Sequence, residues 1–213
     1  MSVDAEALVV PIFPLDNVLL VPGGILPLHI FEARYRSMVT DAVGGDRLIA
    51  MAVPLPGRST EHEERPPVHP VCGLGLIVHH DPLDDGRSHI VLHGFSRIRI
   101  LEEIESGRPY RLIRGRPTED VVPDDVDLGA RAKDLVRRLG DLADEDRERL
   151  LALPPGRLVD AILGPLDAPI QDKQRIHASD DVAWRLGELE ALLDLLGGSR
   201  YRTEIPDDDP RVN

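Results

Sequence analysis

The alternation of apolar and polar positions over the first 120 or so residues predicts a succession of short strands. The opening segment ALVVPIFPL is rich in β-branched and apolar residues, which favour a strand. Pro11 and Pro14 cannot donate hydrogen bonds to a central ladder, so we expect an edge or entry strand here. The following segment LLVPGGILPL contains two prolines and a Gly-Gly pair, and it must therefore run extended and bent rather than helical.

The spacing of apolar residues changes after Glu32, where they recur at helical intervals. The apolar positions on one helical face are Tyr35, Met38, Val39, Ala42 and Val43. This pattern predicts a short amphipathic helix, closed by the glycines at 44 and 45. The apolar run at residues 47–53 then predicts a buried strand. The proline- and charge-rich stretch at residues 54–70 predicts a long loop that is either mobile or functional.

A hairpin pattern follows this loop. GLGLIVHH and SHIVLHG flank the turn sequence DDG at residues 84–86, and such a turn between two apolar runs is typical of paired strands. The segment SRIRILEEI continues the second strand, with Ile98 and Ile100 alternating with Arg97 and Arg99. The first part of the chain is therefore predicted to be strand-dominated.

The second part of the chain is predicted to be helical. Leu128, Leu135, Leu139 and Leu142 share one face of a helix whose start is marked by Asp124 and Asp125, and the prolines at 154 and 155 end this region. Short helices are expected around residues 158–162 and through IQDKQRIH. A long helix capped by Ser179 is expected to follow, with leucines on its apolar face and glycines at its end.

These patterns predict an α+β fold with two domains. We expect a β-rich domain at residues 1–120, a helical bundle at residues 121–198 and a disordered tail at residues 199–213, whose composition offers little apolar surface. No stretch approaches the roughly 18 apolar residues of a membrane span. The start MSVDAEALVV has acidic residues where a secretory signal carries basic ones, so we expect a cytoplasmic protein that does not contact membranes.

Charge and cysteine content narrow the function classes. The net charge of −13 is spread over both halves, with 12 basic against 17 acidic side chains in residues 1–120 and 13 against 21 in residues 121–213. Neither half matches a nucleic-acid phosphate backbone, so a nucleic-acid partner is not expected. The single cysteine, Cys72, excludes an internal disulfide and a cysteine-based zinc cage.

Three blocks of the sequence carry a resemblance to a known family. PIFPLDNVLLVPGGILPLHIFEARYRSMV resembles the opening motif of the amino-terminal domain of Lon proteases, and VCGLGLIVHHDPLDDGRSHIVLHGFSRIRILE is similar to its second block. LVDAILGPLDAPIQDKQRIHASDDVAWRLGELEALL resembles the third region, so the likeness covers about residues 8–196. It implies a PUA-like β pseudo-barrel followed by a small helical bundle.

The resemblance also implies a function. The Lon amino-terminal domain recognises unfolded or tagged polypeptides, so we expect a non-catalytic recognition protein, an adaptor or regulator in proteolysis, with a protease or chaperone among its partners. No G-x-x-x-x-G-K-[ST] loop is present, so neither ATP hydrolysis nor peptide cleavage carries over, no cofactor is expected, and the chain reads as a stand-alone form of the domain. Extended peptides bind open strand edges and apolar grooves, and the candidate contact residues are Phe31, Arg34 and Tyr35. Each of these three residues could equally be a core or solvated residue.

Two other functions remain open from the sequence. Residues 97–116 hold six arginines against three glutamates, and PUA-like folds elsewhere bind RNA. The candidate RNA-binding residues are Arg97, Arg99, Arg111, Arg114 and Arg116. The alternative is an ordinary polar strand face paired with neighbouring glutamates, and the 3% aromatic content offers few platforms for base stacking.

The second open function is a small metal-dependent hydrolase. His79, His80, His89 and His93 surround an acidic turn, but adjacent histidines of a strand point to opposite faces, so no metal site is expected. Cys72 has no neighbour that would lower the pKa of its thiol and is expected to be a small buried residue without a catalytic role.

Overall fold

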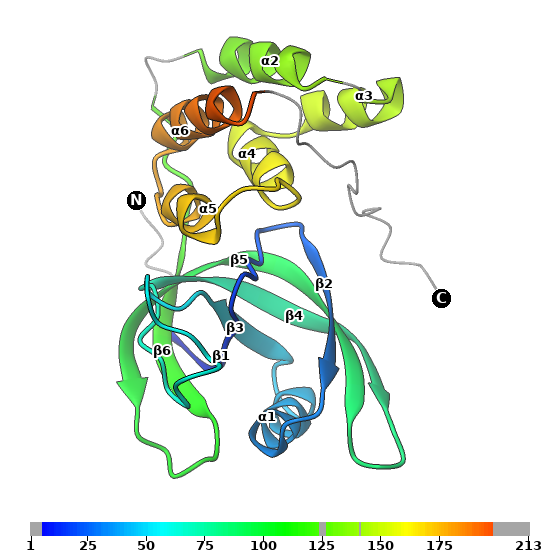
Figure 1. Ribbon diagram of the computed structural model, residues 1–213, viewed down its shortest axis with the longest axis vertical. Helices are drawn as coiled ribbons and strands as arrows, with labels where there is room; N and C mark the ends of the chain where they lie inside the picture. Colours follow the sequence, from blue (N-terminus) through cyan, green and yellow to red (C-terminus); the bar gives the residue numbers. More distant parts are fainter. Residues whose placement is uncertain (1–5, 124–126, 141, 198–213) are drawn as a thin grey trace. The chain divides into compact units, whose positions relative to one another are not determined.

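The computed structural model describes residues 6–123, 127–140 and 142–197, and Figure 1 shows their elements. The chain divides into two compact units, Met1–Thr118 and Glu119–Asn213, and each is described by itself. The domains predicted from the sequence meet at residue 120. The predicted tail at residues 199–213 lies outside the described residues, as do Asp124 and Asp125, where the sequence predicts a helix start.

The first unit consists of six strands and one helix within the described residues. In chain order these are β1 (Leu8–Pro14), β2 (Ile25–Ile30), α1 (Ala33–Val43), β3 (Leu48–Ala52), β4 (Val71–Pro82), β5 (Ser88–Ile104) and β6 (Arg111–Thr118). The two strands of the predicted hairpin, β4 and β5, are the longest, with 12 and 17 residues.

Five of these strands form a closed ring. β5 pairs with β4, β4 with β3, β3 with β1, β1 with β6, and β6 returns to β5 (Figure 1). All of these pairings are antiparallel except β1 with β3. A closed ring removes the exposed hydrogen-bonding edges of its strands. The predicted barrel-like sheet of an α+β fold is therefore confirmed.

The place of β1 corrects one prediction from the sequence. β1 lies between β3 and β6, so the expectation of an edge or entry strand is wrong. The prolines are tolerated because the parallel ladder with β3 begins only at Ile12, after Pro11, and because Pro14 is the last residue of the strand. Among the described strands, β2 is the one that pairs on a single side, with β5, and it carries Pro27 near its middle.

Two apolar clusters hold this unit together. One cluster contains Val10, Ile12, Ala50, Ala52, Cys72, Leu74, Ile98 and Ile113, which come from all five ring strands and fill the inside of the ring. The other packs the predicted face of α1 against the sheet, with Met38 and Val39 fully buried beside Phe13 and Ile77. Burying one such aliphatic or aromatic side chain contributes about 1.5–3 kcal/mol, so these clusters are the main source of stability.

Two glycines allow residues 20–24, the crossing segment, to pass close to the backbone of the ring. A side chain at Gly73 of β4 would collide with the carbonyl oxygen of Leu20, and one at Gly94 of β5 would collide with that of Val21. The amide of Gly94 donates to the oxygen of Gly24 at 2.7 Å, which fastens this crossing segment. The glycines are therefore required by close backbone approach.

The long loop at residues 54–70 is fastened at several points. Pro54 and Val68 form an isolated bridge across its base. The hydroxyl of Ser59 donates to the carboxylate of Asp16 at 2.8 Å, and the hydroxyl of Thr60 donates to it at 2.9 Å. Burial of the Asp16 carboxyl raises its pKa, but these hydrogen bonds outweigh that effect and leave the pKa below its ordinary value. This loop is thus an ordered wall of the first unit.

The second unit consists of helices within the described residues. They are α2 (Leu128–Arg138), α3 (Asp144–Ala152), α4 (Pro155–Leu163), α5 (Ile170–His177) and α6 (Val182–Leu195). α5 coincides with the predicted segment IQDKQRIH. The helix predicted on the face from Leu128 to Leu142 ends earlier, at Arg138, and α3 follows it without having been predicted. None of the described helices is long and apolar enough to cross a membrane.

The helix starts differ from those predicted. Asp127 caps α2 by accepting a hydrogen bond from the amide of Ala130 at 3.0 Å. Asp181, rather than Ser179, caps α6 by accepting from the amide of Trp184 at 3.0 Å. The Ser179 hydroxyl instead accepts from the amide of Asp181 at 3.2 Å and so supports the capping residue.

A buried arginine organises the second unit. Arg185 of α6 is fully buried and forms ion pairs with Asp160 of α4 and, at 2.9 Å, with Asp120. The neighbouring Val121 forms a parallel bridge with Asp181, through a hydrogen bond from its amide to the oxygen of Asp180 at 2.7 Å. Residues 120 and 121 are therefore fixed to the start of α6.

Candidate functional site

A pocket of about 610 Å³ opens in the first unit, a volume typical of ligand-binding pockets. Its lining residues are Ile12, Pro14, Glu32, Ala33, Arg34, Tyr35, Glu64, Arg65, Pro109, Tyr110 and Arg111. They come from β1, the first turn of α1, the loop at residues 54–70 and the start of β6. The pocket thus joins four segments that are distant in sequence.

The inner part of the pocket is apolar and aromatic. Tyr35 and Tyr110 are buried, and the Tyr35 ring lies 4.1 Å from that of Phe13, measured between centroids. Burial raises the pKa of the Tyr35 hydroxyl, so this side chain stays neutral at physiological pH. The hydroxyl of Tyr110 donates to the carboxylate of Asp41 at 2.6 Å, which fixes the ring at the pocket wall. These rings are ordered, but Phe13 and the Arg34 guanidinium already contact the Tyr35 ring, so a ligand's apolar side chain can contact only the parts that they leave open.

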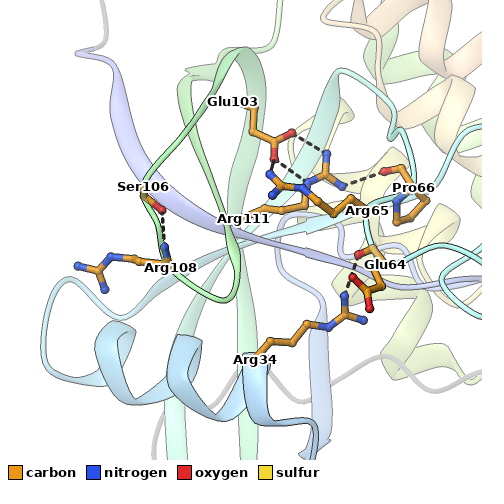
Figure 2. A network of polar contacts seen from close by, with 8 residues as sticks. All are labelled: Arg34, Glu64, Arg65, Pro66, Glu103, Ser106, Arg108 and Arg111. Atoms are coloured by element: carbon orange, nitrogen blue, oxygen red, sulfur yellow. Dashed lines mark hydrogen bonds and ion pairs between the residues drawn. The ribbon is translucent and has the colours of Figure 1, made fainter.

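The rim of the pocket is built from paired arginines. Figure 2 shows Arg65 and Arg111 pointing toward Glu103 of β5. Arg111 contacts both carboxylate oxygens, at 3.0 and 2.9 Å, and also donates to the backbone oxygen of Pro66 at 2.8 Å. The hydrogen bond from Arg111, with further support from Arg65, lowers the pKa of the Glu103 carboxyl. Glu103 therefore remains ionised and ties the loop to β6.

Arg34 makes a second attachment of the same loop. Its Nε donates to the carboxylate of Glu32 at 2.9 Å. Its Nη1 donates to the backbone oxygen of Glu64 at 2.7 Å, as Figure 2 shows. The guanidinium also lies over the Tyr35 ring, 4.5 Å from its centroid, in a cation–π arrangement. Arg34 thus links the floor of the pocket to its outer wall.

The structure separates the predicted peptide-contact residues. Arg34 and Tyr35 line the pocket, whereas Phe31 does not. Phe31 is 61% exposed, and its ring lies 5.8 Å from that of His29, measured between centroids, at the outer surface of β2. Two of the three residues therefore belong to one cavity, and the third belongs to a different surface.

The structure places the residues of the predicted RNA-binding strip in different surroundings. Arg97 is only 3% exposed and is not available to an outside ligand, which corrects its assignment to a solvated face. Arg111 belongs to the pocket rim, and Arg114 forms an ion pair with Glu102 at 2.7 Å. Arg99 and Arg116 lie opposite each other in the β5–β6 register. These five arginines do not form one open basic surface.

The candidate catalytic and metal-binding residues also have defined places. Within residues 6–123, 127–140 and 142–197, no group of three or more histidine, cysteine, aspartate or glutamate side chains is arranged to hold a metal ion. His89 pairs in register with His29 of β2. Cys72 is buried in the ring, and burial raises the pKa of its thiol to about 12, so the reactive thiolate is scarce at neutral pH.

Several residues that line the pocket could not be identified from the sequence. Glu64 and Arg65 lie in the loop at residues 54–70, and its unusual length is the one signal that predicts a functional role. Pro109 and Tyr110 lie in a turn between strands, where no local pattern distinguishes them. Their role depends on the ring closure that places β6 beside β1.

Comparisons with known proteins agree with one another. The family described as the ATP-dependent protease La (LON) substrate-binding domain matches residues 9–195. Lon protease of Desulfosudis oleivorans is 26% identical over 211 residues, which cover 93% of this chain and 26% of that protein. Lon protease of Anaeromyxobacter dehalogenans is 28% identical over 207 residues, which cover 90% of this chain and 23% of that protein. The chain therefore spans about a quarter of the length of these relatives.

Solved structures show the same fold. The Lon N-terminal domain protein from Xanthomonas campestris matches with a TM-score of 0.63 at 21% identity, covering 86% of this chain and 98% of that one. The N-terminal domain of the Mycobacterium avium complex Lon protease matches with a TM-score of 0.64 at 20% identity, covering 89% and 98%. At this level of identity the likeness concerns architecture alone.

Proposed function

We propose that this chain, which belongs to the LON substrate-binding domain family, recognises polypeptide substrates in Lon-like proteolysis and does so through the pocket of its first unit. The observation that carries the proposal is a cavity of about 610 Å³ that combines a neutral aromatic floor with a polar rim. Pockets of this kind accept an apolar side chain while polar groups fix the rest of the ligand. The role is recognition without catalysis.

The position of Arg34 and Tyr35 supports this proposal. Both residues lie in the first turn of α1, where a bound chain could contact the aromatic ring and the guanidinium together. The rim offers charged groups that bind backbone carbonyls and amides, which every polypeptide presents. Such contacts are tolerant of sequence, as recognition of many unfolded chains requires. The cargo would be unfolded or tagged polypeptides, and an adaptor role toward a protease or chaperone is the finer part of the proposal.

A binding assay with a blocked pocket tests the proposal. Ala33 is exposed and lines the pocket in the first turn of α1, so Ala33→Trp fills the cavity without removing a side-chain contact. The matched control is Ala130→Trp, an exposed alanine in the first turn of α2 in the other unit. Fluorescence anisotropy would follow binding of a labelled protein in its unfolded and folded forms.

We expect the unaltered chain to prefer the unfolded form and Ala33→Trp to weaken binding by about tenfold or more, equivalent to about 1.4 kcal/mol. Ala130→Trp should bind as the unaltered chain does. Equal binding by both variants would place recognition elsewhere on the molecule. Absence of any preference for the unfolded form would overturn the proposed function itself.

A further inference from the structure

We infer, on the basis of the proposed function, that the pocket selects polypeptide segments in which a carboxylate lies next to an apolar side chain. The apolar side chain would occupy the aromatic floor beside Tyr35 and Tyr110. The carboxylate would bind at the rim, to Arg65 and Arg34. The carboxylate is the shared chemistry of two sources, a free chain terminus and an internal acidic residue.

The inference begins with the charged side chains at the rim of the pocket. Arg65 and Arg111 share the single carboxylate of Glu103, so these three side chains together keep one unit of positive charge. Arg111 is only 12% exposed, and all three of its nitrogens are engaged, so its role is to position Glu103 and the loop. Arg34, Glu32 and Glu64 also line the pocket, so the six charged groups at the rim carry no net charge, and what Arg65 presents to a ligand is its unused N–H donors.

Arg65 is available to a ligand. Its side chain is 64% exposed, and its contact with Glu103 uses Nη2. A guanidinium carries five N–H donors in a planar fork that matches a carboxylate. Arg65 therefore has donors left for a second carboxylate while it keeps its partner, and it stands at the mouth of the cavity.

Arg34 supplies a second guanidinium to the pocket, paired with the carboxylate of Glu32. Its Nε and Nη1 are engaged by Glu32 and by the Glu64 backbone, which holds the guanidinium still above Tyr35. The adjoining first turn of α1 contains no acidic residue, and its N-cap Glu32 makes no side-chain cap. The amide groups of this turn favour an anion in the same way as the arginine donors.

The negative net charge of the whole chain limits where a carboxylate ligand can bind. A net charge of −13 disfavours approach of anionic ligands to most of the surface, so a carboxylate binds best where exposed arginine donors such as those of Arg65 are offered. Binding should be modest and sensitive to salt, because the rim is partly exposed to solvent. The carboxylate would therefore contribute to the choice of segment, and the apolar floor would contribute most of the affinity.

Two matched pairs of labelled peptides test the inference. The first ends in phenylalanine with a free carboxylate, and the second is the same peptide amidated. The third is amidated and carries a glutamate after the phenylalanine, and the fourth replaces this glutamate by glutamine. Each is titrated against the unaltered chain, Arg65→Gln and, as a control outside the pocket, Arg114→Gln.

We expect the carboxylate-bearing peptides to bind about fivefold more tightly than their neutral partners, as a partly exposed charge-assisted contact allows. Arg65→Gln should abolish this preference, while Arg114→Gln should keep it. A preference for the first peptide alone identifies chain ends as ligands, and an equal preference for the third identifies acidic side chains; both support the inference.

Two results would overturn the inference while the proposed function stands. One is equal affinity for all four peptides, and the other is a carboxylate preference that survives Arg65→Gln. If neither the peptides nor the unfolded protein bind, the proposed function fails and the inference fails with it. Because Arg65 is exposed, its substitution should leave the fold intact, and circular dichroism of the variant checks this.

Discussion

Arg111 donates hydrogen bonds from Nε and Nη2 to the two carboxylate oxygens of Glu103, at 3.0 and 2.9 Å. Its third nitrogen, Nη1, donates to the backbone oxygen of Pro66. One side chain thereby joins β6, β5 and the loop at residues 54–70. The loop forms the outer wall of the pocket, so the shape of the site depends on a residue whose three guanidinium nitrogens are all engaged within the fold.

Arg111→Ala should loosen this wall. We expect a loss of about 2 kcal/mol in the free energy of unfolding, because a charge-assisted contact and a hydrogen bond to a backbone oxygen disappear together. Urea denaturation measures the change. Arg114→Ala, which breaks the exposed pair with Glu102, should cost less than about 1 kcal/mol; similar losses for the two variants would contradict the role given to Arg111.

The Glu103 pair also predicts a dependence of stability on pH. Contacts with Arg111 and Arg65 lower the pKa of Glu103 in the folded state below its ordinary value of 4.5. The ionised form is therefore the stabilising one, so its contribution is present above pH 4.5 and is lost as the pH falls through the lower folded value. The stability difference between the unaltered chain and Glu103→Gln should be largest at neutral pH and should narrow between about pH 5 and pH 3. A constant difference over this range would argue against the ion pair.

Gly73→Ala should destabilise the ring. A side chain at this position meets the carbonyl oxygen of Leu20, and backbone cannot rotate away as a side chain can. We expect a loss of at least about 2 kcal/mol in thermal or urea unfolding, comparable to strong overpacking of a core. Gly44→Ala serves as the control in the same unit, since its nearest neighbour would be the Thr40 oxygen at an ordinary 3.5 Å. Equal stability of the two variants would mean that the crossing segment can move aside.

Arg185→Ala should unfold the second unit more readily. Removal of the guanidinium leaves the buried Asp160 carboxylate without this partner, which costs about 3–5 kcal/mol in comparable buried pairs. Far-UV circular dichroism should show an earlier loss of helical signal. Arg137→Ala, at a side chain that is 74% exposed, should leave the melting curve nearly unchanged.

The elements with strong periodicity could be predicted from the sequence. The face of α1 formed by Tyr35, Met38, Val39 and Ala42 is buried as expected, because an amphipathic helix has one stable orientation on a sheet. α3 escapes prediction because Leu150 is its single buried residue, so it carries almost no apolar pattern. Asp144, Glu145 and Asp146 in its first turn are the weaker signal that a helix begins there.

The burial of Arg97 shows why alternation alone can mislead. Leu74 of β4 pairs with Ser96, whereas the next residue, Gly75, pairs with Gly94. Phe95 is thus an extra residue in β5, and beyond it the two faces of the strand are exchanged. A register shift of this kind depends on the partner strand, so it cannot be read from β5. The pocket is unpredictable for a similar reason, since its four segments meet only through tertiary pairing.

The closed ring has a consequence for the resistance of this unit to aggregation. An open sheet edge can template the addition of a passing extended segment and so start aggregation. Ring closure withdraws the edges of five strands, and among the described strands only β2 keeps an unpaired side. Pro27 lies in this short strand, where a proline is tolerated if its nitrogen faces away from the partner, which removes a donor from the open side. Ring closure and Pro27 therefore leave few open strand edges at which an extended chain could add and start aggregation.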